Sequence, residues 1–170
     1  MIRILFVCHG NICRSPMAEY IFNDIVRREG LERDVQALSA GTSAEELGRP
    51  VYPPAKSYLR RLGIDPSGKR ARVMERGDFE RFDLIVAMER YNVRNMARFC
   101  PPGGMDKVRL LRDFTDSPGD IDDPWYSGDF EGVGRQIEEG CAGLLEYLKH
   151  EYPYLRGGQG SRKHSHELKI

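Results

Sequence analysis

The sequence predicts an α/β fold in which helices cover both faces of a parallel sheet. Short apolar runs alternate with longer amphipathic segments along the chain, and this pattern is typical of repeated β-α-β units. At 170 residues the chain has about the length of one domain. Its residues are 40% hydrophobic and 31% charged, a composition typical of a globular protein and unlike that of a disordered chain.

Four segments are predicted to be strands of this sheet. The first, residues 2–7, is an apolar run interrupted only by Arg3, as expected of a strand that is buried on both faces. The second, residues 35–40, ends before a glycine. The third, residues 83–88, has the sequence DLIVAM and is the clearest core strand. A short fourth strand is predicted at residues 108–111.

Four further segments have apolar residues at helical spacing and are predicted to be helices. They are residues 16–28, 54–62, 89–99 and 130–150. The stretch 113–129 is dense in Asp, Pro, Gly and Ser and is predicted to be a loop. These elements form a single predicted domain of residues 1–152. Residues 156–170 are polar and rich in glycine, so we expect a disordered C-terminal tail there.

Charge balance and hydropathy exclude several classes of partner. Lys plus Arg and Asp plus Glu both number 26, so the net charge is zero and a globally basic nucleic-acid binder is excluded. No apolar run approaches the roughly 18 residues that a membrane-spanning helix needs, and the apolar N-terminal run is too short for a signal peptide. We therefore expect a cytoplasmic protein with neither a nucleic-acid nor a membrane partner.

The four cysteines suit neither a secreted disulfide framework nor a zinc site. Cys8 and Cys13 lie in one short segment, whereas Cys100 and Cys141 stand alone and are predicted to be small buried residues. A zinc site needs further clustered ligands, and none accompany the first pair. We therefore expect no metal and no cofactor.

The loop after the first strand is the predicted functional site, because ligands of parallel α/β folds bind beyond the carboxyl ends of the strands. It contains Cys8 and Arg14 in a C-x5-R arrangement between a strand and a helix. Backbone N–H groups of a loop that leads into a helix bind anions, and the planar fork of an arginine binds two phosphate oxygens at once. Because such a positive field favours thiolates, we expect Cys8 to be ionised near neutral pH.

Several neighbours of this pair fit an anion-binding loop. Gly10 and Asn11 are residue types that tolerate the positive φ of a loop that turns its N–H groups inward. Ser15 is the predicted N-cap of the first helix, and Pro16 is predicted at its first position.

The segment V-C-H-G-N-I-C-R-S-P-M-A-E strongly resembles the low-molecular-weight protein tyrosine phosphatase family, and the resemblance extends over about residues 1–150. Three further motifs follow in the family's order: Ser39-Ala40-Gly41-Thr42, Gly68-Lys69-Arg70-Ala71-Arg72 and Asp123-Pro124-Trp125-Tyr126. The resemblance implies a three-layer α/β/α fold, flavodoxin- or Rossmann-like, with a four-stranded parallel sheet in the order 2-1-3-4. It also implies a phosphate-binding loop after the first strand.

The activity that the resemblance implies is hydrolysis of phosphotyrosine monoesters through a phosphocysteine intermediate, without a metal. Cys8 would be the nucleophile, Arg14 would bind the phosphate, and Asp123 would be the general acid. Spacing alone does not choose among the neighbouring aspartates, so the choice of Asp123 is carried over from the family motif. The implied phosphate-binding loop, which Ser39 supports, also contains His9, Gly10, Asn11, Ile12, Cys13 and Ser15.

The implied partners are phosphotyrosine-containing proteins or peptides, with phosphate and other oxyanions as inhibitors, and the implied assembly is a monomer or weak dimer. The sequence departs from the family pattern at three places. Lys69 replaces a histidine of the supporting network, and a charged lysine cannot accept a hydrogen bond. At the pocket wall, Glu45 or Glu46 stands where some members have tryptophan, and an acidic wall would disfavour acidic phosphopeptides. Trp125 replaces the first tyrosine of the family's common D-P-Y-Y motif, and with Tyr126 it keeps an aromatic wall for a phenyl ring.

Two alternative activities on the same fold remain open. A protein-arginine phosphatase resembles this family closely, although those relatives have threonine at the position of Ile12. Arsenate reduction needs two further cysteines close together, and Cys100 and Cys141 are far apart in the sequence. A protein that only binds phosphate would be favoured if Cys8, Arg14 or Asp123 were missing, and all three are present.

Overall fold

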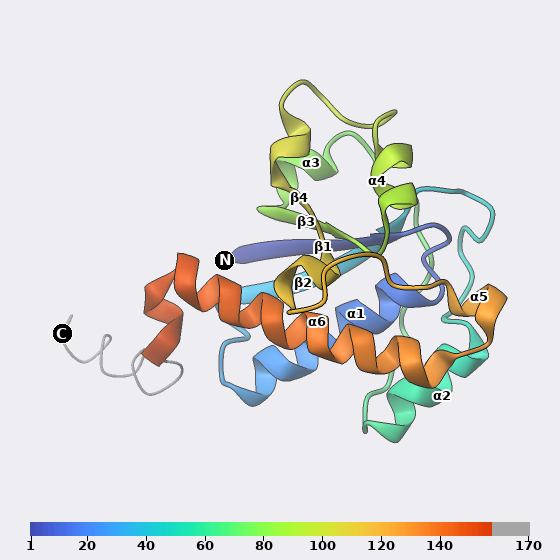
Figure 1. The fold of residues 1–170 in the computed structure, drawn as a ribbon, viewed down its shortest axis with the longest axis horizontal. Helices are drawn as coiled ribbons and strands as arrows, with labels where there is room; N and C mark the ends of the chain where they lie inside the picture. Colours follow the sequence, from blue (N-terminus) through green and yellow to red (C-terminus); the bar gives the residue numbers. More distant parts are fainter. Residues whose placement is uncertain (158–170) are drawn as a thin grey trace.

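The middle layer of the computed structural model, which describes residues 1–157, is a four-stranded parallel sheet in the order β2-β1-β3-β4 (Figure 1). Every strand begins and ends within one residue of its predicted position. The strands are β1 (Ile2–Cys8), β2 (Val35–Gly41), β3 (Leu84–Ala87) and β4 (Val108–Leu110). The predicted strand order and parallel direction are confirmed.

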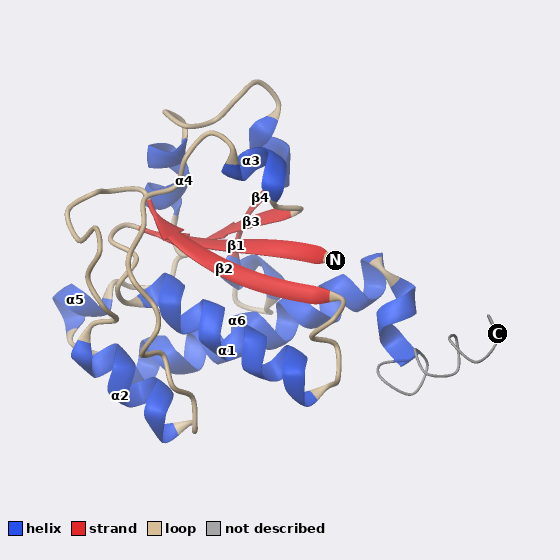
Figure 2. Cartoon of the chain, turned by 180° about the vertical axis from the view of Figure 1, so that it is seen from behind, coloured by secondary structure: helices blue, strands red, loops and turns tan. Residues whose placement is uncertain are grey.

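Helices cover both faces of the sheet, as predicted (Figure 2). On one face lie α1 (Arg14–Arg28), α2 (Pro53–Arg61) and α6 (Phe130–Glu151). On the other face lie α3 (Asp78–Arg81) and α4 (Arg90–Met96). The remaining elements are short: α5 (Pro124–Ser127) and the 3₁₀ turns η1 (Gly104–Lys107), η2 (Leu111–Phe114) and η3 (Pro153–Gly157).

β1 is a central strand, and its side chains alternate between the two cores. Ile4 and Phe6 belong to the core on the side of α1 and α6, whereas Leu5 and Val7 belong to the core on the opposite face. All four are fully buried. This burial on both faces explains why the segment is apolar almost without interruption.

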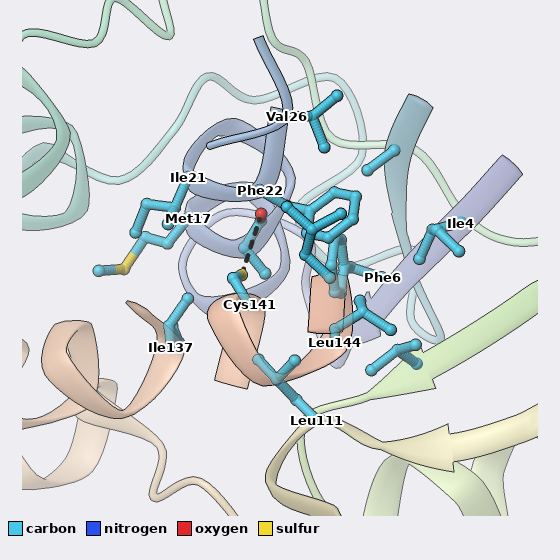
Figure 3. Close-up of a cluster of buried hydrophobic side chains, with 14 of the residues drawn as sticks. Ile4, Phe6, Met17, Ile21, Phe22, Val26, Leu111, Ile137, Cys141 and Leu144 are labelled. Carbon is cyan, nitrogen blue, oxygen red and sulfur yellow. Dashed lines mark hydrogen bonds between the residues drawn. The ribbon is translucent and has the colours of Figure 1, made fainter. Parts of the chain in front are cut away.

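The larger core lies between the sheet and helices α1 and α6 (Figure 3). Phe6 and Phe22 pack edge to face with ring centroids 5.8 Å apart, an arrangement that adds about 0.5–1.5 kcal/mol to the burial of the rings. Cys141 is fully buried in this core, and its thiol donates a hydrogen bond to the carbonyl oxygen of Ala18. The prediction of a small buried residue is confirmed for Cys141. It is wrong for Cys100, which is only half-buried because it follows α4 in a loop.

The start of α1 differs from the prediction. The helix begins at Arg14, and its N-cap is Cys13 rather than Ser15. Ser15 does not cap the helix because its hydroxyl contacts the Cys8 thiol and accepts from the Asn11 amide. Pro16 is tolerated inside the first turn, where its missing N–H would have no intrahelical acceptor.

The long predicted loop and the predicted tail also differ in part. The stretch 113–129 contains the one-turn helix α5, which is too short to give a periodic signal. The first two residues of the predicted tail, Arg156 and Gly157, belong to η3, and residues 158–170 lie outside the described residues. No helix within residues 1–157 is long and apolar enough to cross a membrane.

Candidate active site

The loop that joins β1 to α1 lies at the carboxyl ends of the strands (Figure 1). Cys8 is the last residue of β1 and Arg14 is the first residue of α1. β2 approaches the loop closely, and its last residue, Gly41, pairs with Cys8. A Cβ at Gly41 would lie 2.7 Å from the carbonyl oxygen of His9. A glycine at this position therefore allows the strand and the loop to lie side by side.

The Cys8 thiol lies at the base of the loop with only 3% of the residue exposed. Its Sγ is 2.9 Å from Oγ of Ser15, and the backbone N–H of Asn11 donates to it at 3.3 Å. A thiolate accepts hydrogen bonds and does not donate them. Both neighbours can donate a hydrogen bond, as an anionic sulfur requires.

Asn11 organises the loop around this sulfur. Its φ is 60°, and it is the only non-glycine residue within residues 1–157 that has a positive φ. Its amide group donates to Oγ of Ser15 and to Oγ of Ser39, both at 2.9 Å. Its Oδ1 accepts the backbone N–H of Arg72 at 3.0 Å. A substitution at Asn11 would thus disturb three separate segments of the chain.

Gly10 does not have the positive φ that the sequence predicts for it, so that prediction holds only for Asn11. The reason for a small residue here is contact with the pocket wall instead. A Cβ at Gly10 would lie 3.2 Å from Cγ of Glu46, which is closer than ordinary van der Waals contact.

Arg14 lines the same pocket as Cys8 and is only 2% exposed. Its Nη1 lies 2.6 Å from Oε2 of Glu89 and donates to the carbonyl oxygen of Ile121 at 2.8 Å. Its Nη2 lies 3.5 Å from Oδ2 of Asp123. Burial lowers the pKa of Arg14, but the negative groups around the guanidinium outweigh burial and raise the pKa above its ordinary value. The guanidinium therefore stays charged.

Glu89 is a site residue that the sequence motifs do not predict. It is the N-cap of α4, where its side chain and that of Asn92 form a capping box. It follows β3 by two residues, and β3 is a direct neighbour of β1 in the sheet. A carboxylate just beyond the carboxyl end of a strand next to β1 is the signal that could have identified it.

Asp123 is the only aspartate of its loop that lines the pocket. As the N-cap of α5, it accepts the backbone N–H of Trp125 through Oδ1 at 3.0 Å, while Oδ2 is the oxygen near Arg14. Of the other candidates, Asp120 pairs with Arg90, and Asp116 and Asp122 are exposed. The structure thus distinguishes Asp123 from the neighbouring aspartates, which sequence spacing alone could not do.

An acidic wall borders the pocket, and it contains both residues that the sequence analysis left as alternatives. Glu45 and Glu46 each line the cavity. Oε2 of Glu45 lies 3.5 Å from Nε2 of His9, which also lines the pocket. Glu46 forms an ion pair with Arg49 at 3.2 Å. Within residues 1–157, Glu45 therefore forms an ion pair with no lysine or arginine and is the less compensated of the two charges.

An aromatic wall comes from the start of α5, where Trp125 and Tyr126 line the pocket and are exposed. The ring of Tyr52 lies 4.9 Å from that of Trp125, measured between centroids. The backbone N–H of Tyr52 donates to the carbonyl oxygen of Ile12 in the phosphate-binding loop at 2.9 Å. Tyr52 thus connects the aromatic wall to the loop. The sequence does not predict Tyr52 as a site residue, because it is distant in sequence from both.

Cys13 lies in the same pocket as Cys8 and is also buried. Burial raises the pKa of Cys13, and the charges of Cys8 and Asp123 raise it further. It is therefore a neutral thiol near pH 7. All four cysteines are free.

The pocket thus combines a nucleophilic sulfur, a buried guanidinium, the N–H groups of a loop and a carboxylate that can carry a proton. Such a set can bind a tetrahedral oxyanion, attack its central atom and protonate a leaving group. Within residues 1–157, no group of three or more His, Cys, Asp or Glu side chains is arranged to hold a metal ion.

Comparisons with known proteins give the same chemistry. The family described as low molecular weight phosphotyrosine protein phosphatase matches residues 3–154. The chain is 39% identical over 153 residues to the low molecular weight protein-tyrosine-phosphatase YfkJ of Bacillus subtilis. The match covers 89% of this chain and 98% of that protein. It is 42% identical over 137 residues to the low molecular weight phosphotyrosine protein phosphatase of Schizosaccharomyces pombe. This match covers 78% of this chain and 86% of that protein.

Solved structures give the same fold. The crystal structure of YfkJ from Bacillus subtilis has a TM-score of 0.86 with 38% identity and covers 89% of this chain and 96% of that chain. A crystal structure of the protein tyrosine phosphatase from Entamoeba histolytica, with Hepes in its active site, has a TM-score of 0.83 with 28% identity. It covers 89% of this chain and 99% of that chain.

Proposed function

We propose a mechanism from one premise: the chain belongs to the low molecular weight phosphotyrosine protein phosphatase family and is a cysteine-dependent protein-tyrosine phosphatase. Its substrates are accordingly phosphoproteins. The observation that supports the mechanism is that Cys8, Arg14 and Asp123 line one pocket. The first two residues lie at either end of one loop, and the third comes from a distant part of the chain.

In the first step the Cys8 thiolate attacks the phosphorus of a phosphotyrosine monoester. A sulfur–phosphorus bond forms as the bond from phosphorus to the phenolic oxygen breaks, and Asp123 gives its proton to that oxygen. The loop N–H groups and Arg14 hold the three remaining phosphoryl oxygens, on which charge is spread in the transition state.

In the second step water attacks the phosphorus of the phosphocysteine. Asp123 takes the proton of the attacking water, the sulfur–phosphorus bond breaks, and inorganic phosphate leaves. Ser15 supports the departing thiolate, because its Oγ lies 2.9 Å from Sγ of Cys8. Since phosphate is the product, phosphate and other oxyanions of similar shape are expected to inhibit by occupying the loop.

The contacts of Arg14 indicate which of its donors bind the substrate. Both hydrogens of Nη1 are used, one toward Glu89 and one toward the carbonyl oxygen of Ile121. We assign Nε and Nη2 to the phosphoryl oxygens. Because the guanidinium is fixed before the substrate arrives, little ordering remains to be done at the moment of reaction.

The two walls of the pocket suggest how the rest of the substrate is bound. Trp125 and Tyr126 are assigned to the phenyl ring, which aromatic side chains contact favourably. Glu45, as the less compensated acidic residue, is assigned to the residues that flank phosphotyrosine. It is expected to disfavour acidic flanks by like-charge repulsion.

The proposed unit of function is a single phosphatase domain of residues 1–152, acting in the cytoplasm as a monomer or weak dimer. One continuous core supports the single domain, because it includes β1 and α6, the first and last long elements of that range. The net charge of zero is consistent with a partner that is neither nucleic acid nor membrane.

The two alternative activities have less support. Cys141 is fully buried in the core behind α1, where it cannot relay a disulfide for arsenate reduction, and no cysteine pair other than Cys8 and Cys13 lines the pocket of the described chain. The walls of the pocket also give little support to a protein-arginine phosphatase. The exposed aromatic wall suits the flat phenyl ring of phosphotyrosine better than the flexible aliphatic stem of phosphoarginine.

A panel of three peptides tests the proposal. The peptides share one sequence and carry phosphotyrosine, phosphoserine or phosphoarginine at the same position. We expect the wild type to hydrolyse the phosphotyrosine peptide far faster than the other two. Cys8→Ser should abolish turnover yet still bind inorganic phosphate, because the loop amides and Arg14 remain. Faster release from phosphoarginine, or steady-state hydrolysis by Cys8→Ser, would overturn the proposal.

A further inference from the structure

A groove lies between α4, the 3₁₀ turn η1 and the edge strand β4 (Figure 1). Its volume is about 470 Å³, which is within the range of binding clefts. Its apolar floor consists of Val93, Met105, Val108 and Leu110, of which all but Met105 are half-buried. Its rim consists of three exposed arginines, Arg90, Arg94 and Arg109. The groove thus offers aliphatic surface and positive charge to one ligand.

Two arginines of the rim form no ion pair with a carboxylate of the described chain, residues 1–157. The guanidinium of Arg94 lies over the ring of Tyr91, 5.7 Å from its centroid. Nη1 of Arg109 donates to the backbone carbonyl oxygens of Asp106 and Val108, both at 2.9 Å. These contacts with an aromatic face and with neutral carbonyl groups do not cancel the charge of either guanidinium. Both are therefore able to attract a negatively charged ligand.

The acidic residues beside the rim offset its charge only in part. Oδ1 of Asp120 pairs with Nε of Arg90 at 3.3 Å, and Asp113 lines the groove. Residues 90–113, which include the whole lining, contain six Lys or Arg and two Asp, whereas the complete chain has 26 residues of each sign. The groove therefore lies in a basic part of a chain whose net charge is zero, and its charge complements an acidic partner.

Tyr91 connects the groove to the active site. Its ring lies 6.3 Å from the ring of His9, measured between centroids, and His9 lines the pocket that contains Cys8. Tyr91 is exposed, and Arg94 both lies over its ring and lines the groove. An extended chain advances about 3.3 Å per residue, so a segment that leaves the pocket past His9 reaches Arg94 within about four residues. The flank of a bound phosphopeptide can therefore enter the groove.

The free edge of β4 is already used, so an occupant of the groove binds through its side chains. The carbonyl oxygen of Val108 accepts from Arg109, and the N–H of Leu110 donates to Oδ2 of Asp113 at 3.1 Å. A further strand would have to displace both contacts to pair with β4. Aliphatic side chains suit the floor and carboxylates suit the rim. A segment that combines acidic and aliphatic residues thus fits the groove.

We propose that the groove is a docking site for the phosphoprotein substrate, in which acidic residues of the substrate bind Arg94 and Arg109 and its aliphatic residues occupy the floor. The docked segment begins about four residues from phosphotyrosine. The inference rests on the proposed function, because its occupant is part of the substrate. It also gives the mouth of the pocket two sides of opposite charge. Glu45 disfavours acidic residues next to phosphotyrosine, whereas the rim favours them further along the chain.

A single-stranded nucleic acid or an anionic membrane fits the groove less well. Base stacking needs aromatic side chains, and the lining of this groove has none. Insertion into a membrane interface needs apolar side chains that protrude, whereas three of the four floor residues are half-buried. Both remain outcomes that the experiment distinguishes.

The experiment compares kcat/KM for four peptides that share phosphotyrosine and four neutral residues on either side of it. Two peptides add an extension of alternating Glu and Leu, one before and one after this common part, and the other two have Gln in place of Glu. The neutral flanks keep acidic residues away from Glu45. On one side of phosphotyrosine we expect Glu to raise kcat/KM by about 2- to 25-fold over Gln, as two exposed ion pairs would. The gain should shrink at high salt through screening.

Variants of the rim and the floor test the two kinds of contact separately. Arg94→Gln and Arg109→Gln should each reduce the gain from Glu by about 1.4- to 5-fold, the effect of one exposed ion pair. Met105→Gln should lower kcat/KM with the Glu and the Gln extension alike, because both contain Leu, by up to about fourfold for one buried methylene. Each value is divided by kcat/KM for phenyl phosphate, which has no extension, so that a general effect of charge on the pocket cancels.

Arg33→Gln is the matched control. Arg33 is also exposed, but it lies in the turn before β2, at the end of the sheet away from the pocket. The variant removes the same charge and should leave the gain from Glu in place.

Three results would overturn the inference. The first is a Glu extension that gives no gain, or an equal gain on both sides of phosphotyrosine. The second is a gain that survives when Arg94→Gln and Arg109→Gln are combined. The third is binding of phosphatidylserine vesicles or of a single-stranded oligonucleotide that this double variant loses while its peptide kinetics stay unchanged. A wild type that hydrolyses none of the phosphotyrosine peptides would instead overturn the proposed function.

Discussion

Nη1 of Arg14 lies 2.6 Å from Oε2 of Glu89, so the guanidinium that is proposed to bind phosphate is already held by a carboxylate at the other side. The two residues are distant in sequence and meet because β1 and β3 are neighbours whose carboxyl ends share one edge of the sheet. The ion pair fixes the direction of the guanidinium and leaves Nε for a ligand, together with Nη2, whose other neighbour is Oδ2 of Asp123 at 3.5 Å.

Glu89→Gln should therefore impair turnover more than phosphate binding. The amide still reaches the α4 cap but holds Arg14 less firmly, and we expect kcat to fall by about 10-fold or more because orientation is lost. Phosphate binding should not weaken, since a negative charge near the anion is removed. Steady-state kinetics with inorganic phosphate as competitive inhibitor measure both quantities. An unchanged kcat would contradict the positioning role of Glu89.

Asp123 is expected to matter most for substrates whose leaving group needs a proton. Asp123→Asn keeps an acceptor for the Trp125 N–H that caps α5 but cannot donate as a carboxylic acid. We expect a loss of about 10²–10⁴-fold with phenyl phosphate and a much smaller loss with p-nitrophenyl phosphate. Asp122→Asn, at an exposed neighbour, is the control and should have little effect. Equal losses with both substrates would mean that another group supplies the proton.

Glu45→Gln should relax discrimination against acidic peptides. For a phosphotyrosine flanked by aspartates, kcat/KM should rise by about 1.4- to 5-fold at low salt, because an exposed charge pair is worth about 0.2–1 kcal/mol. The gain should shrink at high salt through screening. Phenyl phosphate, which has no flanking residues, is the control substrate. An equal gain with phenyl phosphate would show that Glu45 acts on the phosphate rather than on the flanks.

Cys13 either packs as a small buried side chain or traps oxidised Cys8 as a disulfide that reductant can reverse. Because burial raises the pKa of Cys13, its thiol stays protonated at neutral pH, and trapping should become faster as the pH rises toward that pKa. Peroxide treatment followed by reductant, at pH 7 and at pH 9, compares wild type with Cys13→Ser. We expect recovery to be greater for the wild type, most of all at the higher pH. If wild type and Cys13→Ser recover equally at both pH values, the role of Cys13 is packing.

The close packing of α6 predicts a stability effect at Gly143. A Cβ there would lie 1.9 Å from the carbonyl oxygen of Phe114. Overpacking of this kind costs about 1–3 kcal/mol, against a gain of about 1 kcal/mol in helix propensity from Gly to Ala. Gly143→Ala should thus lower the free energy of unfolding in urea, whereas Gly68→Ala, where nothing lies within 4 Å, should be near neutral. A stabilised Gly143→Ala variant would show that η2 moves away freely.

Sequence patterns predicted the sheet and its long helices because those elements bury periodic apolar faces. β1 and β3 are buried on both sides, and their apolar runs are accordingly continuous. The short helices α3 and α5 escaped prediction, since one turn gives no period. Their positions depend on tertiary contacts and caps, such as the N-cap at Asp123.

The candidate site was predictable as far as it is local in sequence. Cys8 and Arg14 share one loop, so their spacing could be recognised. Glu89 and Tyr52 join the site only through the order of the strands and the path of the loops, which spacing does not contain. Ser15 illustrates a different limit: serine at a helix start is usually a cap, but here its hydroxyl is used by Cys8 and Asn11.

The central position of β1 has a consequence for biosynthesis. β1 pairs only with strands that follow it in the chain, so Cys8 leaves the ribosome well before β2, β3 and Asp123 exist. At about 5–20 residues per second, the delay between Cys8 and Asp123 is roughly 6–23 s. The loop and the side chains that surround Cys8 reach their final arrangement only after α1 and β2 have packed against it. A nascent chain therefore presents an unassembled site to the cell, and the complete catalytic set forms only once the general acid has been synthesised.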